Sequence, residues 1–153
     1  MKVEYKKASL HNINSMQELV LPEVESGVIL ERSSDEIATN IRSYTLAYTD
    51  GILVGFCALH IHTSSLAEIR SLIVKDGYRG QKIGEGIISR CIDEASSLGL
   101  QKVLSLTYQQ SFFEKLGFFE IPKESLPEHK IWADCIKCKH FPICNEVSLI
   151  KNL

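Results

Sequence analysis

The segment over residues 67–95 holds the residues best suited to bind an anionic ligand. A dense apolar run is followed by a tight turn and then by Arg79, Gly80, Gln81, Lys82, Ile83 and Gly84 at the opening of a long amphipathic helix. The glycines let a ligand approach the backbone, and the first-turn N–H groups have no partners within the helix and carry the positive end of its dipole. Such a strand–loop–helix unit can bind a pyrophosphate, with Arg79 and Lys82 adding charge-assisted contacts. The alternative is an ordinary βα turn with solvated basic residues.

A second cluster with chemical potential lies near the end of the sequence, spaced Cys135-x2-Cys138-x-His140-x3-Cys144. Zinc favours the Cys-x2-Cys spacing, and a third thiolate with His140 would complete a tetrahedral structural site. Only one such pair is present and the remaining spacing is tight, so a disulfide or simple buried thiols are the alternatives. Cys57 and Cys91 have apolar neighbours and are expected in the core.

The periodicity around these segments predicts a single α/β domain over residues 1–153, with a Cys-rich segment at 132–146. A capping box formed by Ser33 and Glu36 opens a helix, and Asp50-Gly51 joins the two strands of a hairpin. The region 21–30, with Pro22, is expected to be a connection. The expected strands are 3–7, 44–49, 52–61, 67–75, 103–106, 118–121 and 147–151. The expected helices are 10–20, 33–42, 80–98 (beginning at Gly80 or Gln81) and 109–116. The order β-α-α-β-β-β-α-β-α-β-β predicts a mixed, mostly antiparallel sheet of about seven strands with about four helices.

Composition excludes several classes of function. The chain of 153 residues has 17 Lys and Arg against 19 Asp and Glu, a net charge of −2, which argues against a nucleic-acid binder because no basic excess is available for phosphates. No apolar run approaches a membrane span, and the N-terminus lacks a signal sequence. An odd number of cysteines does not suit an extracellular disulfide framework. A cytoplasmic protein is expected.

The 67–95 segment resembles the signature of the GNAT acetyltransferase superfamily, Arg/Gln-x-x-Gly-x-Gly/Ala after a strand, with Lys82 where the signature has glycine. The segment SFFEKLGF (111–118) is similar to the family's helix beside the thiol end of the cofactor, and the element order matches. The resemblance implies acetyl-CoA as cosubstrate, held along the strand by backbone pairing, with a backbone N–H polarising the thioester carbonyl. The implied cofactor-binding residues are Leu72, Ile73, Val74, Arg79, Gly80, Gln81, Lys82, Ile83, Gly84 and Phe113.

Within the superfamily, the sequence resembles the short, single-domain N-acetylglutamate synthases. The matching pieces are ILERSSDEI (29–37), AEIRSLIVKDGYRG (67–80), SLIKNL (148–153) and the Cys-rich segment. This resemblance implies an amino-acid N-acetyltransferase that acetylates the α-amine of L-glutamate by direct transfer in a ternary complex, in arginine biosynthesis. Dimers are common among such proteins, so a homodimer is a further expectation.

Acetyl transfer to an amine needs a base, and Glu68 is the candidate. Strand alternation predicts one face for Glu68, Arg70, Leu72 and Val74. A carboxylate takes a proton from an amine if it is desolvated or acts through water. A salt-bridged Glu68 beside Arg70 is the alternative.

The remaining candidates concern the acceptor and the leaving thiolate. Arg32 and Arg70 are the candidate donors for an anionic acceptor because a guanidinium binds a carboxylate with two hydrogen bonds; the alternative is a pair of surface cations. Tyr108 is the candidate general acid, since Phe113 stands where many family members have tyrosine. His60 and His62 are expected to form a solvent-facing pair.

Two other functions are compatible with the sequence. One is an acetyltransferase for a peptide N-terminus, a polyamine or an antibiotic amine, which would need a carboxylate-lined cleft. The other is a non-catalytic acyl-CoA-binding or metal-sensing module built around the Cys-rich segment.

Overall fold

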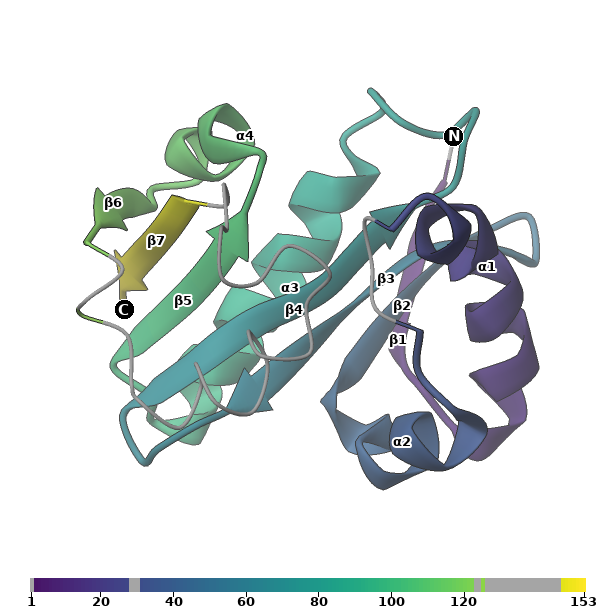
Figure 1. Ribbon diagram of the computed structural model, residues 1–153, viewed down its shortest axis with the longest axis horizontal. Helices are drawn as coiled ribbons and strands as arrows, with labels where there is room; N and C mark the ends of the chain where they lie inside the picture. The colour runs from purple at the N-terminus through teal and green to yellow at the C-terminus, as the bar shows by residue number, and fades with distance from the viewer. Residues whose placement is uncertain (1, 28–30, 123–124, 126–146) are drawn as a thin grey trace.

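The computed structural model describes residues 2–27, 31–122, 125 and 147–153 and contains a seven-stranded sheet in the order β1-β2-β3-β4-β5-β7-β6 (Figure 1). Only the β4–β5 pair is parallel, and every other pair is antiparallel. The predicted fold class, strand number and element order are therefore confirmed. The strands are β1 (Glu4–Lys7), β2 (Tyr44–Thr49), β3 (Ile52–Ile61), β4 (Leu66–Val74), β5 (Lys102–Thr107), β6 (Phe119–Ile121) and β7 (Val147–Asn152).

Four α-helices lie in the described part of the chain: α1 (Ile13–Glu25), α2 (Ser34–Thr39), α3 (Ile83–Leu98) and α4 (Gln110–Lys115). Helix α2 begins at the predicted capping box, where Ser33 Oγ accepts a hydrogen bond from the Glu36 N–H at 3.2 Å. The positive φ of Gly99 ends α3, as a C-terminal glycine does.

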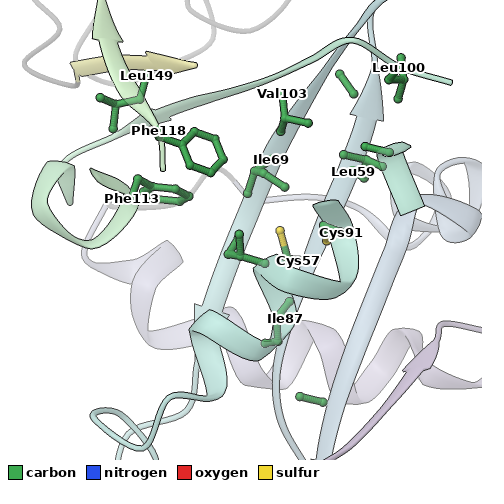
Figure 2. Packing of buried hydrophobic residues seen from close by; sticks show 14 of the residues in the cluster. Cys57, Leu59, Ile69, Ile87, Cys91, Leu100, Val103, Phe113, Phe118 and Leu149 are labelled. Atoms are coloured by element: carbon green, nitrogen blue, oxygen red, sulfur yellow. The ribbon is translucent and has the colours of Figure 1, made fainter. Parts of the chain in front are cut away.

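Two hydrophobic clusters lie on opposite faces of the sheet. Helix α3 covers one face, where Ile87 and Cys91 pack with residues of β3, β4 and β5 (Figure 2). Helices α1 and α2 cover the other face over β2 and β3, where Met16 and Ile37 are buried with Phe56. Burial of Cys57 and Cys91 confirms that both belong to the core.

Several helix boundaries differ from the sequence prediction, among them the end of α1 and the start of α3. Helix α1 continues through Pro22 to Glu25; a proline there removes only one N–H donor near the end of the helix. Helix α3 begins at Ile83 because Gly80 and Lys82 have φ values of 79° and 63°, which are incompatible with a right-handed helix.

A bulge in β4 corrects the predicted arrangement of its side chains. Ser71 has a φ of 56°, and the register with β3 shifts between Phe56 and Ala58. The extra residue reverses the alternation, so that Leu72 and Val74 pack against the α3-side cluster. Glu68 and Arg70 therefore lie on the opposite face, and the prediction that all four share one face is wrong.

Strands β4 and β5 separate after a short pairing. Their register covers only Leu66–Ile69 with Lys102–Ser105, although β4 continues to Val74 and β5 to Thr107. Figure 1 shows the two strands starting together and diverging toward their C-terminal ends. In the described part of the chain, the β4–β5 register thus ends before residues 71–74, which lie next to the turn that leads to α3.

Candidate active site

A pocket on the α2-side face of the sheet brings together two arginines that are far apart in the sequence. Arg32 precedes α2, and Arg70 comes from β4 next to the bulge. The pocket is lined by Arg32, Asn40, Ser43, Tyr44, Ala58, His60, Arg70 and Ser71. Among these residues, positive charge predominates, so the pocket suits an anionic ligand.

The two arginines also influence the phenol of Tyr44. Burial raises the pKa of Tyr44 above its usual value, and the positive charges of Arg32 and Arg70 oppose this rise. Arg32 additionally contacts Glu36 at 3.6 Å within the first turns of α2.

Glu68 lies beside this pocket, but its side chain does not line it. The side chain is 4% exposed, and its Oε1 atom accepts hydrogen bonds from His62 Nε2 at 2.8 Å and Arg70 Nε at 3.1 Å. One carboxylate oxygen thus contacts both the His62 ring and the Arg70 guanidinium. Glu68 thereby fixes the orientation of the Arg70 guanidinium.

The two histidines correct another expectation. The side chain of His62 is 3% exposed and contacts Glu68 at 2.8 Å, so His62 does not face solvent. The rings of His60 and His62 meet edge to face, with centroids 4.8 Å apart. His60 is the member of the pair that lines the pocket. Sequence alternation placed both on one face, but their pairing with Glu68 depends on the β3–β4 register.

The predicted phosphate-binding segment forms the connection from β4 to α3. Lys82 adopts the left-handed conformation that glycine favours, so the backbone geometry tolerates the departure from the family signature. The first α3 hydrogen bond runs from the Gly86 N–H to the Lys82 carbonyl. The N–H groups of residues 83–85 therefore precede the helical hydrogen-bond ladder, as an anion site requires.

Arg79 contributes to this connection differently from expectation. Its side chain, 54% exposed, contacts Glu23 of α1 at 2.7 Å, Asp76 at 2.8 Å and the Val74 carbonyl at 2.9 Å. In this structure Arg79 joins α1 to the loop. A phosphate contact from Arg79 would require it to exchange these partners.

The aromatic residues of α4 are placed differently from the sequence expectation. Phe113, the predicted cofactor contact, is 3% exposed and packs edge to face with Phe112 and Phe118 in the core. A side chain on Gly84 would approach the Phe112 ring at 3.3 Å. Phe112 is therefore the α4 side chain beside the start of α3. Phe112 and Phe113 are adjacent in a short helix, and the sequence pattern did not show which of the two lies beside α3.

Tyr108 immediately follows β5, at the end where β5 is no longer paired with β4. Its side chain is 50% exposed, so it is accessible from solvent.

The remaining predicted ligands, Cys135, Cys138, His140 and Cys144, lie outside the described residues. Within the described ranges no group of three or more His, Cys, Asp or Glu side chains could hold a metal ion. Cys57 and Cys91 lie side by side between β3 and α3 (Figure 2), where burial raises the pKa of the Cys57 thiol. These two thiols are part of the packing and do not line the pocket.

The fold and the geometry of the site can now be compared with known families. A βα connection, whose first helical N–H groups precede the hydrogen-bond ladder, lies beside two diverging strands, and a pocket that contains two arginines lies on the sheet. The family model "Acetyltransferase (GNAT) family" matches residues 11–118. The chain belongs to this family, and it is an acetyl-CoA-dependent N-acetyltransferase of the GNAT type.

Comparison with individual proteins adds detail. An uncharacterized N-acetyltransferase of Chlorobaculum tepidum is 37% identical over 127 residues, 83% of this chain and 81% of that protein. An amino-acid acetyltransferase of Enterobacter sp. is 26% identical over 129 residues, 83% of this chain but 29% of that protein. This chain therefore matches less than a third of the amino-acid acetyltransferase.

A solved structure shares the fold. N-acetylglutamate synthase from Neisseria gonorrhoeae, complexed with coenzyme A and N-acetyl-glutamate, superposes with a TM-score of 0.89 at 24% identity, covering 100% of this chain and 35% of that one. Across the described residues of the present chain, no helix is both long and apolar enough to cross a membrane.

Proposed function

We propose that this protein transfers the acetyl group of acetyl-CoA to the α-amine of a small anionic amino acid, with L-glutamate as the first candidate. The observation that carries the proposal is the presence of Arg32 and Arg70 in one pocket. Two guanidinium groups match the two carboxylates of a dicarboxylic amino acid. A polyamine or another basic acceptor would instead need a carboxylate-lined pocket.

The relatives support the same acceptor. The amino-acid acetyltransferase and the N-acetylglutamate synthase described above each match this chain over most of its length. Acetylation of glutamate would place the protein in arginine biosynthesis, and its working environment would be the cytoplasm.

Acetyl-CoA is proposed to bind in the opening between β4 and β5. Residues 71–74 of β4, beyond the register with β5, offer backbone N–H and C=O groups to the pantetheine arm, in the manner of strand pairing. The start of α3 offers N–H groups to the pyrophosphate. Lys82 and Gln81 lie on the loop that leads there, and Phe112 lies beside Gly84.

The reaction is proposed to be a direct transfer in a ternary complex. The acceptor ammonium loses one proton, and its nitrogen then attacks the thioester carbonyl and forms the N–C bond. A second proton leaves the nitrogen as the C–S bond breaks, and the CoA thiolate takes up one proton. Tyr108 is the proposed donor of that proton. One proton is released to solvent for each acetyl group transferred.

The proposal is tested by CoA release from acetyl-CoA with each of the twenty amino acids. Glutamate is expected to give the highest kcat/KM. Arg32→Gln and Arg70→Gln are expected to raise the KM for glutamate about 10-fold to 100-fold, since each lost charged hydrogen bond contributes about 1.5–3 kcal/mol. Arg90→Gln, which removes an exposed guanidinium stacked on Tyr5 of β1, is the matched control.

The outcomes separate the acceptors. Equal loss in the Arg90 variant would show a general charge effect and remove the support from the pocket. Turnover of neutral amino acids at the rate of glutamate would overturn the anionic acceptor. If no amino acid is acetylated while CoA still binds, the acceptor is another amine.

A further inference from the structure

We propose that His60 accepts the proton from the acceptor ammonium, and that His62 and Glu68 are positioning residues that act through it. The inference rests on the proposed function, because it supplies the base for that reaction. It replaces Glu68 as the direct base. The Glu68 carboxylate is buried, shared between two partners and not part of the pocket lining.

His60 is placed where the acceptor must lie. It comes from β3, opposite Glu68 in the β3–β4 register, while its neighbour Ala58 is opposite Arg70. Cross-strand partners share a face of the sheet, and both His60 and Arg70 line the pocket. An acceptor whose carboxylate is bound by Arg70 therefore has its amine within the same small pocket as the imidazole. Imidazole is the side chain whose ordinary pKa lies near neutrality, as a general base requires.

A line of contacts fixes the imidazole in place. The Glu68 carboxylate accepts from His62 Nε2 at 2.8 Å, which fixes the His62 ring, and the His62 ring meets His60 edge to face at a centroid distance of 4.8 Å. The same Glu68 oxygen accepts from Arg70 Nε at 3.1 Å. One buried carboxylate thus aligns both the group that binds the acceptor and the group that takes its proton, which is the arrangement that proximity catalysis needs.

The charges around the pocket give Glu68 a second effect. Among the described residues, the pocket that His60 lines also contains Arg70 from β4, Arg32 at the entry to α2 and Tyr44 from β2. His62 contacts the His60 ring, and Glu68 contacts His62. The two arginines disfavour a protonated imidazole, and the Glu68 carboxylate favours it. Neutralising Glu68 is therefore expected to make His60 less basic.

The proton step is balanced without another reactant. An N–H bond of the acceptor ammonium breaks, an N–H bond forms on the imidazole, and the imidazolium releases the proton to water at the mouth of the pocket. The free amine that remains is the nucleophile for the thioester.

The test compares His60→Gln and Glu68→Gln by the pH dependence of kcat with the best acceptor from the amino-acid screen. His60→Gln is expected to lower kcat about 10²-fold to 10⁴-fold and to abolish the acidic limb of the profile. Glu68→Gln preserves the size and shape of the side chain and removes its charge. This variant is expected to lower kcat about 10-fold to 100-fold. Its acidic limb is expected to move to lower pH, because a less stable imidazolium loses its proton at lower pH. His11→Gln, at an exposed histidine, is the matched control.

The opposite pattern would overturn the inference. If Glu68 is the direct base, Glu68→Gln loses the acidic limb and His60→Gln keeps it. A profile that keeps its acidic limb in both variants would equally exclude His60.

A second measurement separates this inference from the proposed function. NMR titration of the histidine rings, assigned by the signal missing in His60→Gln, needs no turnover. In Glu68→Gln the midpoint of His60 is expected to fall, and in His11→Gln it is expected to stay unchanged. Acetylation of no amino acid would refute the proposed function, whereas an unchanged His60 midpoint in Glu68→Gln would refute this inference. The same spectra show whether each variant is folded.

Discussion

At the scale of single residues, Lys82 shows how a departure from a family signature can be accommodated. A glycine is expected at this position because the backbone is left-handed, with a φ of 63° for Lys82. A side chain in this conformation costs about 1–2 kcal/mol. The chain bears that cost at the residue that immediately precedes α3.

Lys82→Gly is accordingly expected to raise the free energy of unfolding by about 0.5–1 kcal/mol, because relief of the left-handed strain exceeds the added entropy of the unfolded chain. Urea denaturation measures this difference. Lys82→Ala, which removes the same ammonium but keeps the strain, should give no such gain. Equal stability of the two variants would show that the conformation carries no strain.

At the scale of elements, the bulge in β4 decides which residues meet. Ser71 occupies a left-handed position within the strand and lines the pocket. Because the bulge adds one residue to β4, Arg70 lies on the pocket side of the sheet while Leu72 and Val74 pack on the α3 side. Without the bulge, strand alternation would put these side chains on one face.

Ser71→Val is expected to lower the free energy of unfolding by about 1–3 kcal/mol, because a β-branched residue is strained at a φ of 56°. It should also raise the KM for the acceptor as Arg70 is displaced. Ser71→Gly, which suits this φ, should be at least as stable as the parent. The measurements are urea denaturation and initial rates. A valine variant as stable as the glycine variant would contradict the assigned strain.

At the scale of the whole molecule, the sheet consists of two parts joined by a short pairing. Strands β1–β4 lie on one side, and β5, β7 and β6 lie on the other. The α3-side cluster spans both, since it includes Ile69 of β4 and Val103 of β5. A ligand in the opening between β4 and β5 would contact both parts and should stabilise the molecule as one unit.

CoA at a hundred times its Kd is therefore expected to raise the free energy of unfolding by about 2.7 kcal/mol. Gly84→Val should lose most of this gain, because a side chain there approaches Phe112 at 3.3 Å and Val74 at 3.7 Å beside the predicted site. Thermal and urea unfolding with and without CoA measure the gain in each protein. Adenosine at the same concentration is the control. An equal gain in the parent and Gly84→Val would place the CoA site elsewhere.

The sequence by itself determined the elements and their order. The Asp50-Gly51 hairpin, the Ser33–Glu36 capping box and the amphipathic pattern of α3 are local signals, and the structure confirms each. Such signals depend on residues a few positions apart, so one chain segment suffices to read them. From the sequence alone, Arg32 and Arg70 were also candidate donors to one anionic acceptor, which requires that both lie in the same pocket.

The tertiary structure alone decided the partners of the site residues. The burial of His62 on Glu68, the place of His60 in the pocket and the choice of Phe112 over Phe113 depend on contacts between separate elements. The bulge at Ser71 reverses the face of every residue after it, and nothing in the local pattern of Val, Ile and Leu announces a one-residue insertion. Register between strands is set by the packing of the whole sheet, and that packing arranges the buried charges.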